Sequence, residues 1–365
     1  MDQRKSALEE KLETLKEEYS KTKYNKATDK HLGILRRKIA EVKKGIIEAS
    51  KGKHGKGFFV KRNGDATVAL VGFPSTGKST IINELAGTNS KTAPHAFTTL
   101  EIIPGMLVYK GAHIQIFDMP GIIEGANLGI GGGRSVISAL RNVDLVVFVV
   151  DVFGYEKIGV LLKELKMLDI NINKGIPKVK IEKVESNIGI VVEKNASSIS
   201  SSDIKVVLRS FNIFNARVFI EDDLSIDELI GLITGRSCYL KAIAVLNKID
   251  MQKNYKEIAD KISNEYGIET VPISAINKAN IEELKEAIYK GIGIMTVYLR
   301  PKNGVNEPII LHKGSTVADA ALKVHTELKN QLKCAYVSGP SAKFANQKVG
   351  ASHVLYDGDI VTFIK

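Results

Sequence analysis

Apolar side chains recur at helical spacing through the first fifty residues. Two series step by four, three and four positions, so each series falls on one face of a helix. They are Leu8, Leu12, Leu15 and Tyr19, then Leu35, Ile39, Val42 and Ile46. The pattern predicts a helical hairpin over residues 1–50, and its role stays open between a structural brace and an arm that docks a protein partner.

Further along the chain, near-continuous apolar runs alternate with helix-like segments. The runs are "ATVALVGF", "HIQIFDMP" and "LVVFVVDV", and the helix-like segments "STIINELAG" and "SVISALRNVD" lie between them. The alternation resumes at "KAIAVLNKID" and continues through "IEELKEAIYKGI". Buried strands that alternate with helices are typical of a mostly parallel sheet. We therefore predict one α/β domain built from residues 66–154 and 239–295.

Two segments join or interrupt this domain. Residues 51–65, "KGKHGKGFFVKRNGD", form a basic, glycine-rich stretch, which we interpret as a linker, with contact to RNA phosphate as the alternative. Residues 155–238 are an insert in which "SSDIKVVLRSF" and "SIDELIGLIT" are helix-like and "ARVFIED" is strand-like. The insert is long enough for a small αβ subdomain.

The C-terminal residues, 296–365, have a different pattern. Short strand-like runs, "TVYLRP", "EPIILHKG", "CAYVSG" and "DIVTFIK", surround one helix-like run, "TVADAALKVHTEL", with Thr316 as its cap. This is the outline of a small ubiquitin-like sheet that holds one helix. Such a fold is commonly a binding module, although a fold alone does not establish a function.

The composition bears on the type of partner, the redox compartment and the possibility of a membrane span. The net charge of +11 favours an anionic partner such as RNA or a ribosome, against the alternative of a surface that only keeps the protein soluble. The only two cysteines, Cys238 and Cys334, imply no disulfide framework and fit a reducing cytoplasm. The longest apolar run, "LVVFVV", is far shorter than the ~20 residues of a membrane span.

The first chemical motif follows the first apolar run. "GFPSTGKST" matches G-x-x-x-x-G-K-[ST], a loop whose backbone N–H groups cradle phosphate oxygens. Lys78 is expected to reach the β- and γ-phosphates, and the Ser79 hydroxyl to bind Mg²⁺. The predicted phosphate contacts are Gly72, Phe73, Pro74, Ser75, Thr76, Gly77, Lys78, Ser79 and Thr80.

Two short motifs next to the second apolar run complete the phosphate site. "DMPG" comprises Asp118, Met119, Pro120 and Gly121; the Asp118 carboxylate can hold Mg²⁺ through water, and the Gly121 N–H can meet the γ-phosphate. "FTT" comprises Phe97, Thr98 and Thr99. We favour Thr99 as the metal ligand because it directly precedes the strand-like "LEII". The predicted metal ligands are thus Ser79, Thr99 and Asp118.

Two later motifs indicate which base is bound. In "NKID", Asp250 can accept hydrogen bonds from guanine N1–H and N2–H, Lys248 can lie on the ring face, and Asn247 can tie the base loop to the phosphate loop. Ile249 completes that motif. "SAI", which comprises Ser274, Ala275 and Ile276, can offer backbone N–H groups to guanine O6. Five motifs in this order, each near the carboxyl end of a strand, predict a GTP site and argue against a P-loop ATPase or kinase.

These motifs carry a resemblance that spans nearly the whole chain. "GFPSTGKST", "FTTLEIIPG" and "DMPGIIEGA" resemble the Obg-like branch of translation-factor-class GTPases. "GDATVALVGFPSTGKST", the insert before "NKID" and a tail that ends "VLYDGDIVTFIK" resemble the developmentally regulated GTP-binding protein (DRG) family. The resemblance implies GTP hydrolysis, a link to ribosomes or translation, an insert similar to a domain of a ribosomal small-subunit protein, and a C-terminal TGS domain of the β-grasp type.

The chain departs from the family pattern at two positions. His95 stands where Obg-like proteins commonly carry Tyr, which leaves the conformation of that loop open. Ser75 stands where several potassium-using GTPases carry Asn, so a K⁺ requirement beside Mg²⁺ is not supported by this residue and stays open.

The sequence lacks one of the usual catalytic residues of a GTPase. Ile122 occupies the position after "DMPG" where many GTPases place a Gln that orients the attacking water, and isoleucine has no polar group to do so. We predict a GTPase with slow intrinsic turnover, with Lys78, Thr99 and Gly121 in its catalytic set and Glu124 and Arg134 as further candidates. The glycine-rich "GANLGIGGGRS" would be a switch segment. The alternative is a ribosome- or RNA-binding factor whose GTP is structural and hardly hydrolysed.

Overall fold

A computed structural model describes residues 2–22, 34–35, 38–39, 41–42, 63–87, 104–119, 139–195, 197–235, 237–300 and 306–364. The chain divides into two compact units, which are described separately. One unit comprises Met1–Gly57 with Lys166–Tyr239, and the other comprises Phe58–Leu165 with Leu240–Lys365. No helix among these residues combines the length and the apolar character needed to cross a membrane.

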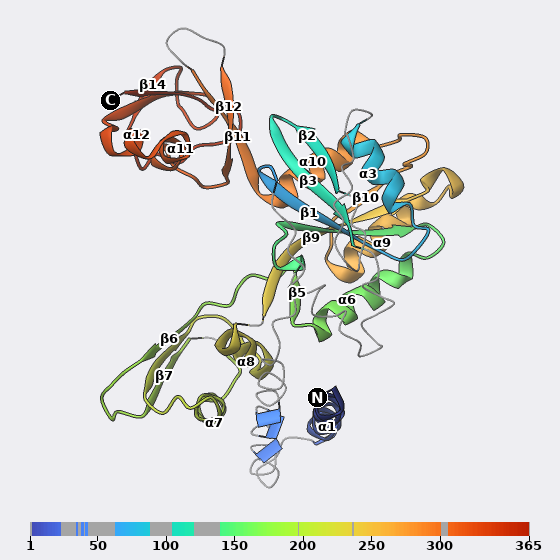
Figure 1. Ribbon diagram of the computed structural model, residues 1–365, viewed down its shortest axis with the longest axis vertical. Helices are drawn as coiled ribbons and strands as arrows, with labels where there is room; N and C mark the ends of the chain where they lie inside the picture. Colours follow the sequence, from blue (N-terminus) through green and yellow to red (C-terminus); the bar gives the residue numbers. More distant parts are fainter. Residues whose placement is uncertain are drawn as a thin grey trace. The chain divides into compact units, whose positions relative to one another are not determined.

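The larger unit contains the α/β domain that the sequence predicts (Figure 1). Its sheet has the order β10-β9-β4-β1-β3-β2; β5 pairs with β9, and both β5 and the first two residues of β9 fall within the smaller unit. The strands are β1 (Ala66–Val71), β2 (Pro104–Tyr109), β3 (Ala112–Asp118), β4 (Leu145–Asp151), β5 (Ile170–Ile172), β9 (Cys238–Asn247) and β10 (Thr270–Pro272). All pairs along the path are parallel except β2 with β3. The prediction of a mostly parallel sheet is confirmed.

The apolar composition of the central strands explains their position. All six residues of β1 are buried, and so are six of the seven residues of β4, because both faces of a parallel sheet are covered. The covering elements are α3 (Lys78–Ala86), α6 (Ile158–Met167), α9 (Tyr255–Tyr266) and α10 (Ile281–Ile292), with short 3₁₀ turns η2 (Tyr155–Lys157) and η3 (Ile249–Met251). The core cluster joins Ile81 of α3 and Leu284 of α10 to Val68 of β1.

The C-terminal domain of the same unit is a five-stranded sheet of order β12-β11-β15-β13-β14 packed on α11. Its elements are β11 (Ile294–Leu299), β12 (Glu307–His312), α11 (Val317–Val324), α12 (Thr326–Gln331), β13 (Cys334–Ser338), β14 (Gln347–Val349) and β15 (Ile360–Ile364). Thr316 caps α11 as predicted, in a capping box with Asp319. The prediction of a single helix is wrong: extended backbone at His325 ends α11, and its ring Nδ1 accepts the Glu327 N–H at the start of α12.

In the smaller unit, the insert is a three-stranded sheet of order β6-β8-β7 with two helices. Its elements are β6 (Val179–Lys183), β7 (Ile190–Lys194), α7 (Ser201–Ser210), β8 (Ala216–Ile220) and α8 (Ile226–Thr234). The part of the insert that belongs to this compact unit is Lys166–Tyr239, and the chain up to Leu165 belongs to the larger unit. Ser200 and Ser225 supply the helix caps, the latter in a capping box with Glu228.

The N-terminal segment of this unit is described in part. Helix α1 (Asp2–Lys21) is present, and residues 34–35, 38–39 and 41–42 are helical. Leu15, Leu35, Ile39 and Val42 form one buried cluster, against which Leu8, Leu12 and Tyr19 pack. The two predicted apolar stripes therefore face each other. Ile46 and most of the 51–65 stretch lie outside the described residues.

Candidate functional site

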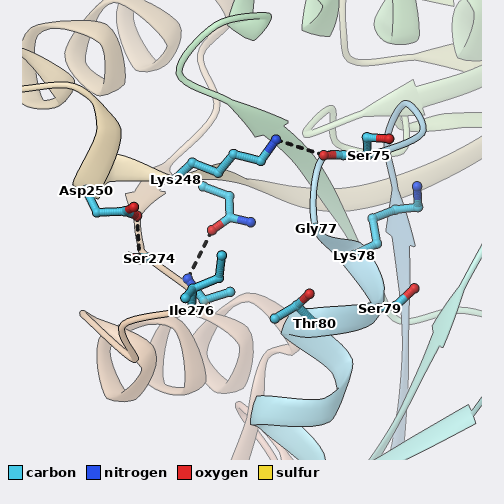
Figure 2. A pocket seen from close by; sticks show the side chains of 11 residues that line it. Ser75, Gly77, Lys78, Ser79, Thr80, Lys248, Asp250, Ser274 and Ile276 are labelled. Carbon is cyan, nitrogen blue, oxygen red and sulfur yellow. Dashed lines mark hydrogen bonds between the residues drawn. The ribbon is translucent and has the colours of Figure 1, made fainter.

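The sheet brings the predicted motifs to one edge. Strands β1, β3, β9 and β10 point the same way, so the loops that follow them meet beyond their carboxyl ends. A cavity of about 350 Å³ lies there (Figure 2). Every described residue that lines it is one that the sequence singled out: Ser75, Gly77, Lys78, Ser79, Thr80, Asn247, Lys248, Asp250, Ser274, Ala275 and Ile276.

The phosphate loop is already folded around its lysine. Lys78 Nζ donates to the carbonyl oxygens of Gly72, at 3.0 Å, and Phe73, at 3.1 Å. Gly77 has φ 93°, and a Cβ on it would lie 2.3 Å from Asn247 Nδ2. Only glycine fits both that backbone conformation and that contact. Helix α3 then begins at Lys78, with Ser79 and Thr80 in its first turn beside the cavity.

Asn247 joins the phosphate loop to the base loops, as the sequence suggests. Its Nδ2 donates to the Thr76 carbonyl oxygen at 2.9 Å, and its Oδ1 accepts the Ala275 N–H at 3.1 Å. The residue is 3% exposed. The Ala275 N–H, which we expected to face guanine O6, is thus donated to Asn247 in this structure.

A second connection runs through Lys248. Its backbone has φ 64°, and its Nζ donates to the Ser75 carbonyl oxygen at 2.8 Å, which Figure 2 marks. The same ammonium lies 2.8 Å from Asp151 Oδ2, and Asp151 Oδ1 accepts the Gly154 N–H at 2.9 Å. Asp151 therefore holds Lys248 against the phosphate loop. Sequence reasoning did not single out Asp151, although it ends the apolar run "LVVFVVD" as Asn247 ends the next strand.

The base-reading carboxylate is held in place by a serine. Ser274 is 1% exposed, and its Oγ donates to Asp250 Oδ1 at 2.5 Å (Figure 2). Ser274 Oγ also accepts the Asn277 N–H at 3.2 Å, which orients the hydroxyl. Asp250 can then present its other oxygen and its remaining lone pairs to a pair of N–H donors, as guanine N1–H and N2–H would supply.

Asp118, at the carboxyl end of β3, fits a metal ion. Its Oδ1 is buried and has no hydrogen-bond partner among the described residues, and Lys78 Nζ lies 3.9 Å away. Burial raises the pKa of this carboxyl, while the charge of Lys78 opposes the rise. An unsatisfied carboxylate oxygen near Lys78 of the phosphate loop is the type of hard oxygen donor that Mg²⁺ prefers.

Pro74 and Ile249 are described but do not line the cavity, and the other predicted site residues fall into two groups. Met119 is 4% exposed and donates its N–H to the Leu70 carbonyl oxygen, so its side chain belongs to the core and only its backbone adjoins the site. The other group lies outside the described residues; it comprises Phe97, Thr98, Thr99, Pro120, Gly121, Ile122, Glu124 and Arg134.

Comparison with known proteins agrees with this geometry. The family model described as "50S ribosome-binding GTPase" matches residues 67–194, the model of the C-terminal region of that domain matches 186–294, and the TGS domain model matches 295–365. The Schizosaccharomyces pombe YchF GTPase is similar in fold, with a TM-score of 0.52 at 16% identity, over 85% of this chain and 100% of that one.

Relatives match over nearly the full length. An uncharacterised GTP-binding protein of Methanocaldococcus jannaschii is 40% identical over 98% of this chain and 93% of its own. Developmentally-regulated GTP-binding protein 2 of Homo sapiens is 36% identical over 98% of this chain and 99% of its own, and the Dictyostelium discoideum homologue is 38% identical over the same shares. With a P-loop that is joined to a base-reading loop, a TGS domain and these relatives, the chain belongs to the developmentally regulated GTP-binding protein family and is a GTP-binding protein.

Proposed function

We propose that this protein hydrolyses GTP to GDP and phosphate with Mg²⁺ and acts as a switch in translation, on a ribosome or an RNA. One observation carries the proposal: Lys78 for the phosphates and Asp250 for the base line a single cavity, joined by Asn247. A site with these fixed polar groups would reject adenine, because Asp250 would face an acceptor at N1 and stay unpaired.

The position of each residue in the site suggests its role in hydrolysis. Lys78 neutralises the charge that develops on the transferred phosphoryl group, and its present carbonyl partners would give way to phosphate oxygens. Ser79 and Asp118, the latter through water, would hold Mg²⁺ together with Thr99, and Gly121 would meet the γ-phosphate. When bound, the ion would neutralise negative charge on the phosphates. Since Ile122 cannot orient water, intrinsic turnover is slow until a partner or another switch residue assists. Nothing about Ser75 calls for K⁺.

The distribution of charge supports an anionic partner. Residues 1–65 contain 18 Lys and Arg against 10 Asp and Glu, and residues 295–365 contain 9 against 5. The rest of the chain is balanced, with 25 against 26. The excess positive charge therefore lies on the parts that do not build the GTP site.

Single-turnover hydrolysis, measured with and without ribosomes, tests this function. We expect slow cleavage of GTP alone and acceleration by ribosomes. No cleavage under either condition, with GTP still bound, would favour the alternative of a ribosome- or RNA-binding factor with structural GTP. The free cysteines fit a cytoplasmic protein, where such an encounter takes place.

A second experiment addresses the tail. Deleting residues 296–365 should lower co-sedimentation with ribosomes and leave GTP affinity nearly unchanged. Each phosphate contact that is lost should reduce the slope of log affinity against log salt by about 0.7–0.9. A tail that instead covers the nucleotide would change the GDP release rate on deletion and leave ribosome binding intact. The attachment of the C-terminal domain at the start of β3, away from Asp118, supports the first outcome.

A further inference from the structure

The C-terminal domain is joined to the GTPase domain by a shared apolar face. Successive residues of β11 point to opposite faces of its sheet. Met295 and Val297 belong to the core of the C-terminal domain, whereas Ile294 belongs to the core cluster of the GTPase domain. Ile310 of β12 belongs to that same GTPase cluster. Part of the outer sheet face of the TGS domain is therefore buried against the GTPase domain.

A buried polar group lies at the centre of this face. Thr296 and Tyr289 are each 2% exposed. Thr296 Oγ1 donates to the Lys110 carbonyl oxygen at 2.7 Å, and its N–H donates to Asp357 Oδ1 at 2.7 Å. Tyr289 OH lies 2.8 Å from Thr296 Oγ1 and 2.9 Å from Asp357 Oδ1. Each of the two hydroxyls has a single proton: Tyr289 OH donates to Asp357, and either hydroxyl can donate in the contact between Tyr289 and Thr296.

A second layer fixes the backbone turn that this group holds. Lys110 has φ 48° and lies between β2 and β3. Its Nζ is 2.8 Å from Glu286 Oε2 and 5.2 Å from the centre of the Tyr289 ring. Tyr109 OH donates to the same carboxylate oxygen at 3.0 Å. We call Tyr109, Lys110, Glu286, Tyr289, Thr296 and Asp357 the junction.

The turn at Lys110 joins β2 and β3 into a hairpin, and the other end of this hairpin lies at Asp118 in the proposed GTP site. Strand β3 runs from Ala112, next to the turn, to Asp118 at the metal site. At about 3.3 Å per residue, the two ends are ~20 Å apart. In the sequence, Thr99 lies five positions before β2 and Gly121 lies three positions after β3, so the proposed metal ligand and the proposed γ-phosphate contact flank this hairpin. An extended strand is near its full length and cannot absorb a displacement by stretching.

From this continuity we infer that the β2–β3 turn passes the nucleotide state of the GTPase domain to the TGS domain through Thr296 and Tyr289. Binding of the γ-phosphate and Mg²⁺ pulls on both strands of the hairpin, and the turn carries β11 with it. The β2–β3 hairpin is thus the element whose conformation depends on both the nucleotide site and the contact with the TGS domain. The inference rests on the proposed GTP–GDP cycle, because it needs two nucleotide states.

Hydrogen exchange of the full-length protein tests the link. Amides of residues 294–299 are compared with Mg²⁺–GDP and with Mg²⁺ and a non-hydrolysable GTP analogue, after titration has shown that both nucleotides are bound. We expect exchange rates in β11 to differ at least threefold between the two states. Tyr289→Phe and Thr296→Val should each abolish the difference and keep nucleotide affinity within twofold of the parent. Thr296→Val retains the N–H bond to Asp357, so it serves as a mild second variant.

The control is Tyr336→Phe, which removes a hydroxyl from a 38% exposed tyrosine on β13 of the same domain. It should leave the nucleotide-dependent difference intact. Equal exchange of β11 in both states, with both nucleotides bound, would overturn the inference and leave the proposed function standing. A difference that persists in both junction variants would overturn it as well. A protein that fails to bind the GTP analogue would overturn the proposed function first.

Discussion

Replacing Asn247 with alanine removes both hydrogen bonds that join the phosphate loop to the base loops. The Thr76 carbonyl oxygen and the Ala275 N–H, at 2.9 and 3.1 Å from the amide, would then lack their partner. Because Asn247 is only 3% exposed, bulk water does not replace the amide. A buried polar group left unpaired costs about 1–3 kcal/mol. For two such groups, we expect the nucleotide-ready arrangement of the loops to lose roughly 2–6 kcal/mol.

This loss should appear in the dissociation constant. At about 1.4 kcal/mol per factor of ten, we expect GTP to bind roughly 30- to 20,000-fold more weakly. GDP should weaken by the same factor, since the bridge supports the loops around the base and the inner phosphates and does not touch the γ-phosphate. Titration with fluorescent GDP and GTP analogues measures both constants, and thermal unfolding of the nucleotide-free variant measures the change in stability separately.

Asn280→Gly is a matched control for this variant. Asn280 donates to the Pro272 carbonyl oxygen at 2.9 Å and has φ 60°, which glycine accepts. The Asn280→Gly substitution removes one asparagine hydrogen bond from the same domain and leaves the phosphate loop unchanged. The melting temperature should therefore fall, with little change in the affinity for GTP or GDP. If Asn247→Ala binds GTP within threefold of the parent while its melting temperature falls, the bridge only stabilises the fold and the reasoning is refuted.

Four further outcomes are expected. Asp250→Asn should weaken GTP binding and favour xanthosine triphosphate, whose base has a carbonyl where guanine has an amine; an unchanged preference for GTP in competition titrations would contradict the role of Asp250. Lys78→Ala and Ser79→Ala should each abolish single-turnover hydrolysis, and either variant working at the parent rate would disprove the phosphate-loop assignment. Thr316→Ala should cost about 0.5–2 kcal/mol and speed hydrogen exchange in α11 alone, whereas Ser225→Ala, the matched capping-box variant of the insert, should act on α8 alone. Burial raises the pKa of Glu164, and its Oε2 has no hydrogen-bond partner among the described residues. The ionised carboxylate therefore opposes folding, and the protein should become more stable as the pH falls and this group is protonated. Glu164→Gln should raise the melting temperature at neutral pH and reduce the increase in melting temperature that the parent shows towards acid pH.

The α/β sheet and the GTP motifs could be predicted because their signals are local. Continuous apolar runs such as "LVVFVVD" occur where a strand is buried on both faces, and the motif residues follow those runs directly. The bridge by Asn247 was predicted too, since its type and position suit a link between neighbouring loops. The identity of its second partner, Ala275, depends on how β9 and β10 pair, and no local pattern encodes that.

The elements that were missed have weaker or misleading patterns. Strands β6 and β7, "VKIEK" and "IVVEK", are exposed on one face and carry charges that short strands share with loops. The apolar spacing of "TVADAALKVHTEL" continues through His325, so periodicity could not show that the backbone is extended there. Asp151 was missed because a lone aspartate after a strand is common, and only its 2.8 Å contact with Lys248 reveals its part in the site.

The direct pairing of β4 with β9 has a consequence for how the protein folds. Leu145 pairs with Lys241, 96 positions further along the chain, and most of the intervening residues form the insert with its own apolar cluster. Loop-closure entropy grows with the length of flexible chain, by about 0.6 kcal/mol per doubling. An insert that collapses first shortens the flexible part of that loop and so brings β9 to β4 at a lower entropic cost. Asn247 and Lys248 are carried by β9, so the nascent chain becomes competent to bind GTP only after this late strand has docked.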